Sequence, residues 1–208
     1  MVRRRAPLFA LLAGLAVLSC ADPSKLVAPK SVPPSFKKGG TPPNPDVPPV
    51  KLHHVFVLKW TPPLKNDLTA SAVIGPEGGT ITLTQLGATF TVPAGALTQR
   101  TTITVRAIAG KHVVFQMAPA GLHFATPATL TMSLAGTNGW HKTKFAQYLR
   151  GGYIPSVLSI GGDDGADDTE DFPALVDDAV TTASWPVPHF SVVILASQRK
   201  IDPGPAVK

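Results

Sequence analysis

The chain has 208 residues, among them 22 prolines, 18 glycines and a single cysteine, and its formal net charge is +6. Only 15% of the residues are charged, and glutamate, lysine and glutamine are too scarce for a coiled coil or a helical bundle. The apolar content is too high for a chain that is disordered throughout. One cysteine excludes an intrachain disulfide, and the length allows one domain or at most two.

The N-terminus has the pattern of a secretory leader. Three arginines stand at positions 3–5, and residues 6–19 form an apolar stretch of fourteen residues. That stretch is too short to cross a bilayer, which takes about 20 apolar residues, but it fits the apolar region of a signal peptide. We therefore predict that residues 1–19 are a signal peptide. Its removal would take away three positive charges and lower the net charge from +6 to +3.

The leader ends at the only cysteine of the chain. Residues 17–20 read Val-Leu-Ser-Cys, which resembles a bacterial lipobox. In lipoproteins of that kind the leader is cut before the cysteine, so the resemblance implies a lipid on Cys20, and three acyl chains anchor far more firmly than one. Ala21 favours the outer membrane by the sorting habit of well-studied bacteria. We expect export and lipid anchoring in the envelope, at the outer membrane or cell surface; the alternative is an ordinary signal peptide.

Residues 20–50 are predicted to be a disordered linker. They contain nine prolines and few large apolar side chains, so they cannot bury enough surface to fold alone. Proline favours the extended polyproline II conformation, which suits a spacer between a membrane and a folded domain. An unstructured tail without a purpose of its own is the alternative. Export and the modest charge of the mature chain disfavour a nucleic-acid partner.

The rest of the chain has the period-two pattern of β-strands. Residues 80–84, 101–107 and 128–134 alternate apolar and polar side chains and are rich in β-branched residues, as half-buried strands are. Glycine and proline turn signals separate the segments. Many short strands favour an all-β fold with one antiparallel β-sandwich. The other predicted strands are residues 55–60, 70–74, 88–92, 112–118, 145–149, 153–160, 180–185 and 189–196. The predicted domain plan is a lead-in strand at 51–69, the sandwich at 70–197 and a flexible tail at 198–208.

Five segments in the predicted sandwich resemble a known family. They are Gly-Pro-Glu-Gly-Gly-Thr-Ile at 75–81, Phe-Thr-Val-Pro-Ala-Gly-Ala-Leu at 90–97, Thr-Ile-Thr-Val at 102–105, Gly-Leu-His-Phe-Ala-Thr-Pro-Ala-Thr-Leu at 121–130, and His-Phe-Ser at 189–191. Together they resemble the ZU-five domain, a β-sandwich module of ankyrins, zonula occludens proteins and netrin receptors that also occurs in bacterial envelope proteins. The resemblance covers about residues 70–196. It implies a non-enzymatic module that binds an envelope or extracellular protein; fold alone does not identify that partner.

The His189-Phe190-Ser191 motif carries the enzyme-class alternative. In some members of the family a His-Phe-Ser at this place is cleaved by the chain itself between Phe and Ser. On a strand His189 and Ser191 share one face while Phe190 points into the core. The Ser191 hydroxyl would attack the Phe190 carbonyl with a nearby histidine as base, and water would open the ester. The structural alternative is a core strand whose polar residues face outward.

An acidic segment is the remaining candidate site. Eight acidic residues lie within positions 163–178 without any lysine or arginine: Asp163, Asp164, Asp167, Asp168, Glu170, Asp171, Asp177 and Asp178. The first five of them could bind Ca²⁺, which prefers oxygen ligands, although the spacing is not that of an EF-hand. A solvated loop tip that keeps a strand edge from pairing is the preferred interpretation.

The histidines do not have the spacing of a zinc site. His53 and His54 are neighbours, so a strand would turn them to opposite faces, which is poor for shared ligation. The sequence contains no phosphate-binding loop and no dinucleotide fingerprint. We therefore expect no cofactor.

Overall fold

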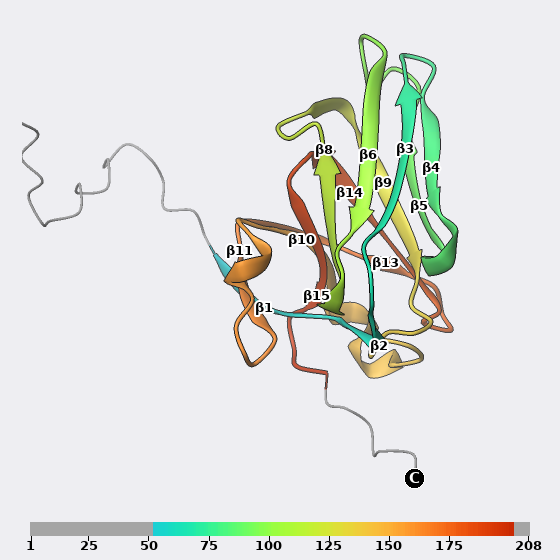
Figure 1. Cartoon of the computed structure of the whole chain (residues 1–208). Helices are drawn as coiled ribbons and strands as arrows, with labels where there is room; N and C mark the ends of the chain where they lie inside the picture. Colours follow the sequence, from blue (N-terminus) through green and yellow to red (C-terminus); the bar gives the residue numbers. More distant parts are fainter. Residues whose placement is uncertain (1–51, 202–208) are drawn as a thin grey trace, which may run out of the picture. The chain divides into compact units, whose positions relative to one another are not determined.

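The structure is a computed structural model, and it describes residues 52–201. The predicted signal peptide, Cys20 and the proline-rich linker lie outside the described residues. The described part confirms the all-β prediction: it consists of fifteen strands, β1 to β15, and three short 3₁₀ helices, and its two larger sheets are antiparallel. Figure 1 shows the two sheets as the layers of a sandwich, with β11 and β1 on one side of the domain and β4 on the other.

The larger sheet has eight strands. Its main path is β11-β1-β15-β8-β6-β3. Strand β10 lies off this path and pairs with both β15 and β12. The bounds of these strands are β1 His53–Val57, β3 Leu68–Ile74, β6 Thr101–Ala107, β8 Val114–Ala118, β10 Leu149–Ile154, β11 Gly165–Asp168, β12 Glu170–Pro173 and β15 Val192–Ser197.

The second sheet has five strands in the order β13-β14-β9-β5-β4, and a two-stranded ribbon, β2 with β7, stands apart from both sheets. The bounds are β2 Lys59–Leu64, β4 Gly79–Leu83, β5 Ala88–Val92, β7 Gly110–His112, β9 His123–Ser133, β13 Leu175–Val176 and β14 Thr182–His189. The 3₁₀ helices are η1 Thr84–Leu86, η2 Thr143–Tyr148 and η3 Val157–Ser159.

The main core lies between the two larger sheets and follows from the alternation in the sequence. Ile103 and Val105 of β6 and Leu130 and Met132 of β9 are buried, whereas the polar residues between them are more exposed. Burying a side chain of this size stabilises the fold by about 1.5–3 kcal/mol. Residues 88–92 and 101–107 form strands with the predicted bounds.

A second, smaller hydrophobic cluster covers the other face of the eight-stranded sheet. Val193 and Leu195 of β15 face the main core, whereas Ile194 and Ala196 belong to the second cluster. Strand β15 is thus buried on both faces, which accounts for its run of apolar residues from Val192 to Ala196. The cluster also contains Val55, Val57, Val114, Ile154 and Ala166.

The predicted bounds were wrong in the segment between β9 and β15. Residues predicted as a strand at 145–149 mostly form η2, because five mixed residues are too few to distinguish the two periods. The strand predicted at 153–160 ends at Ile154, because Pro155 has no N–H to donate to a sheet. The strand predicted at 189–196 is interrupted at residues 190–191, where the chain crosses from one sheet to the other.

Both ends of the described chain are more ordered than predicted. The lead-in segment forms two strands, β1 and β2, and β1 belongs to the eight-stranded sheet. At the other end Ile201 is only 6% exposed and packs into the main core. The beginning of the predicted flexible tail is therefore part of the domain, and residues 202–208 lie outside the described range.

Candidate functional site

The acidic segment lies in paired strands. Strand β11 pairs with β1, and β12 pairs with β10, so most of residues 165–173 belong to the eight-stranded sheet. Asp168 is only 1% exposed, because it shares a strand face with Ala166, which packs into the second cluster. The predicted solvated loop tip is wrong for this stretch.

Asp177 and Asp178 do lie outside strands and are exposed. Hydrogen bonds from the Thr181 hydroxyl, from the Thr182 backbone N–H and from the Thr181 backbone N–H lower the pKa of Asp177 to about 2.

Four histidines from distant parts of the chain meet this acidic segment. His53 and His54 follow each other on β1 and point to opposite faces, as predicted, and each meets a different aspartate. The pairs and their nitrogen–oxygen distances are His53–Asp171 3.0 Å, His54–Asp167 2.9 Å, His112–Asp164 3.1 Å and His189–Glu170 3.0 Å.

The five carboxylates considered for Ca²⁺ therefore have separate partners. These are the Gly165 N–H for Asp163, the Lys59, Lys111 and His112 side chains for Asp164, the His54 ring for Asp167, the His53 N–H for Asp168 and the His189 ring for Glu170. The five do not surround one common position.

Asp164 is the centre of an ion-pair network. Its Oδ2 accepts a hydrogen bond from Lys59 Nζ at 2.9 Å, and its Oδ1 lies 2.7 Å from Lys111 Nζ and 3.1 Å from His112 Nε2. Burial raises the pKa of Asp164, but the hydrogen bonds from Lys111, Lys59 and His112 outweigh it and hold that pKa well below the ordinary value. The network joins the β2–β7 ribbon to the loop before β11.

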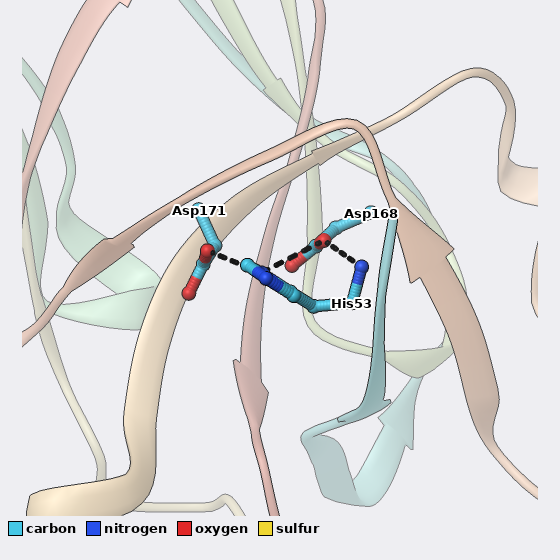
Figure 2. A group of neighbouring side chains, drawn as sticks. All are labelled: His53, Asp168 and Asp171. Carbon is cyan, nitrogen blue, oxygen red and sulfur yellow. Dashed lines mark hydrogen bonds and ion pairs between the residues drawn. The ribbon is translucent and has the colours of Figure 1, made fainter. Parts of the chain in front are cut away.

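His53, Asp168 and Asp171 form a compact group on three strands (Figure 2). His53 Nδ1 lies 3.0 Å from Asp171 Oδ1 and 4.0 Å from Asp168 Oδ1, which also accepts the His53 backbone N–H at 3.1 Å. Burial raises the pKa of Asp168, although the His53 N–H acts in the opposite direction. Arg150 Nε lies 3.5 Å from the second oxygen of Asp171.

Sequence reasoning did not identify this group. It considered His53 only together with His54, and it considered Asp168 only among carboxylates. Alternation places His53 in phase with Val55 and Asp168 in phase with Ala166. One apolar residue beside each polar one is too little to predict that these segments pair.

The His189-Phe190-Ser191 motif lies where β14 ends and the chain crosses to β15. Phe190 is 2% exposed and packs on Phe90 and Phe124, so its predicted place in the core is confirmed. Its carbonyl accepts the Gly121 N–H at 3.2 Å. Ser191 lies in a bend, so the expected continuous strand through His189 and Ser191 is not formed.

The His189 side chain has its own contacts. Its ring stacks on Tyr153 with ring centres 4.2 Å apart, while Nε2 meets Glu170. The Tyr153 hydroxyl donates to the His189 carbonyl at 2.8 Å, and burial raises the pKa of Tyr153 above its ordinary value. These contacts fix the residue that precedes Phe190.

Backbone hydrogen bonds join four of the five segments of the sequence resemblance. Gly95 N–H donates to the Pro76 carbonyl at 2.8 Å, which joins the first motif to the second. The N–H of Ala125 donates to the Ala96 carbonyl at 3.0 Å, and that of Phe190 donates to the Leu122 carbonyl at 2.8 Å. Gly95 adopts a φ of +78°, a left-handed conformation that glycine takes without a steric cost.

Among residues 52–201, no helix is both long enough and apolar enough to pass through a bilayer. No model of a known protein family matches the chain, and no curated protein sequence matches it significantly.

Proposed function

We propose that the chain is an exported envelope lipoprotein whose β-sandwich is a non-enzymatic protein-interaction module. The observation that carries the proposal is the order of the segments. An apolar leader ends at the only cysteine, nine prolines follow, and the first strand begins at His53. This order suits a domain that is held away from a membrane by a lipid on Cys20 and an extended spacer.

A ZU-five-like identity of the module is part of the proposal. It is supported by the backbone hydrogen bonds among four of the five segments, which join residues up to about seventy positions apart in sequence. The partner we propose is an envelope or extracellular protein, since these are what an anchored surface module meets.

Replacing Cys20 by serine tests the anchor. We expect the wild-type protein to incorporate labelled palmitate in a bacterial host and to sediment with membranes, because the thioether lipid needs the cysteine sulfur. The Cys20→Ser variant should lose the label and leave the membrane fraction. Ser19→Ala, which keeps the cysteine, is the matched control and should be labelled. A wild-type protein that is exported without label would contradict the proposal.

Self-cleavage between Phe190 and Ser191 is the second candidate, and one contact favours it. The Gly121 N–H already bonds to the Phe190 carbonyl oxygen, where negative charge would develop during attack. The Ser191 Oγ would bond to that carbonyl carbon and the peptide C–N bond would break, leaving an ester and a free Ser191 amine. Water would then hydrolyse the ester to the Phe190 carboxylate and the serine hydroxyl.

Intact mass distinguishes the two candidates. Under the cleavage hypothesis the wild-type protein separates in denaturant into two chains, the smaller being residues 191–208 with eighteen residues. Ser191→Ala should remain one chain, while Ser191→Cys, which keeps a nucleophile, should still be cut. A single undivided wild-type mass after long incubation would eliminate self-cleavage and leave the binding module.

A further inference from the structure

Three side chains of types that bind metals converge at one end of the second hydrophobic cluster. His53, Asp168 and Asp171 each offer one ligand atom, and these atoms lie within 4.8 Å of one another. They come from three different strands, β1, β11 and β12, rather than from one flexible loop. Ligands on paired strands are held more precisely than ligands on loops.

The strand register places them on one face. His53 lies opposite Asp168 in the β1–β11 pair, next to the Val55–Ala166 pair that packs into the second cluster. Asp171 lies opposite Gly152 in the β10–β12 pair. A Cβ added at Gly152 would lie 3.5 Å from Asp168 Oδ2, which places this oxygen over the β10–β12 pair.

The buried carboxylate of Asp168 is an independent sign of a missing ligand. Its side chain is 1% exposed, and in the described part of the chain its Oδ2 has no hydrogen-bond partner. A buried anionic oxygen without a donor is costly, and nearly all such atoms in proteins are paired. In Figure 2 the Asp168 carboxylate is turned toward the His53 ring, and Asp171 approaches that ring from the other side of the view.

We propose that His53, Asp168 and Asp171 bind one divalent transition-metal ion, with Zn²⁺ the best match. One imidazole nitrogen with two carboxylate oxygens suits zinc, whereas Ca²⁺ takes six to eight oxygen ligands. Two ligands on a tetrahedral zinc ion lie about 3.4 Å apart. The observed distances from His53 Nδ1 are 3.0 Å to Asp171 Oδ1 and 4.0 Å to Asp168 Oδ1, the oxygen that accepts the His53 N–H, and they lie on either side of that value.

The neighbouring arginine is compatible with this site. Arg150 Nε approaches Oδ2 of Asp171, whereas the oxygen that faces His53 is Oδ1. Asp171 can therefore bind the metal with one oxygen and keep the guanidinium on the other. A bound ion would join β1 to β11 and β12. Metal binding goes beyond the proposed interaction function, because it depends neither on a protein partner nor on a lipid at Cys20.

Zinc titration of the full chain tests the proposal. All variants carry Cys20→Ser so that the lone thiol cannot bind the metal. After treatment with EDTA, calorimetry with ZnCl₂ should show one site, and a hundredfold excess over the Kd should raise the melting temperature by roughly 5 °C or more. CaCl₂ should bind far more weakly at this site.

Ligand variants and a matched control locate the site. His53→Gln, Asp168→Asn and Asp171→Asn should each weaken zinc binding at least tenfold. His54→Gln removes the adjacent histidine, whose Nδ1 pairs with Asp167 rather than with the proposed ligands, and should leave binding unchanged. If Asp168→Asn does not fold, the two other ligand variants decide the result. Equal losses in His54→Gln, unchanged binding in His53→Gln and Asp171→Asn, or calcium binding as tight as zinc binding would each overturn the assignment.

Discussion

Replacing Gly151 by alanine is expected to lower the free energy of unfolding by about 3 kcal/mol, the upper end of the usual cost of overpacking. A Cβ at this position would lie 1.9 Å from Cδ1 of Trp185, a ring atom in the facing sheet. Trp185 is 1% exposed and belongs to the main core, so its ring has little free space into which to move. The φ of Gly151 is not left-handed, so the cost is steric rather than conformational.

Urea unfolding of three variants checks this explanation. Gly162→Ala is the control, because nothing lies within 4 Å of its added Cβ, and it should unfold like the wild type. Trp185→Phe makes room opposite Gly151 at the cost of a smaller core side chain. The double variant Gly151→Ala with Trp185→Phe should lose clearly less stability than the sum of the two single losses. Strict additivity would contradict a direct clash.

Alternation predicted the fold well wherever one strand face is buried and the other is exposed. Residues 88–92 and 101–107 are strands with the predicted bounds for that reason. The prediction failed where long-range packing decides the conformation. η2 presents Phe145 to the core from a 3₁₀ helix. The strand predicted through residues 189–196 is interrupted at Phe190, whose ring packs on Phe90 and Phe124 of the five-stranded sheet.

Only one feature of the candidate metal site could be predicted from the sequence, the direction of the His53 side chain relative to His54. Alternation did predict that His53 and His54 face opposite ways, and the structure confirms it. The partners of His53 could not be predicted, because Asp168 is 115 positions away in the sequence and only the register between β1 and β11 brings the two residues together. Charge density alone favoured a solvated loop, since the single buried alanine of β11, Ala166, is too weak a signal for a strand.

Replacing Asp164 by asparagine is expected to lower the free energy of unfolding by about 2 kcal/mol at neutral pH. The variant would leave Lys59, Lys111 and His112 close together without their shared counter-charge. The Asp164 side chain is only 14% exposed, so water cannot fully replace the lost contacts. Asp178→Asn, at an exposed position outside the strands, is the matched control and should unfold like the wild type.

The pH dependence distinguishes this network from a loss of packing. The pKa of Asp164 in the folded state lies below its unfolded value, which is about 3.9. The unfolded chain therefore binds the proton first, so the stabilisation is complete above about pH 4 and is lost as the pH falls through the folded-state pKa. Urea midpoints measured from pH 7 downward should show the wild type approaching Asp164→Asn below about pH 4. A difference in urea midpoint that stays constant with pH would contradict this explanation. It would show that the Asp164 side chain stabilises the domain by its shape, and that its charge adds nothing to the contact with the β2–β7 ribbon.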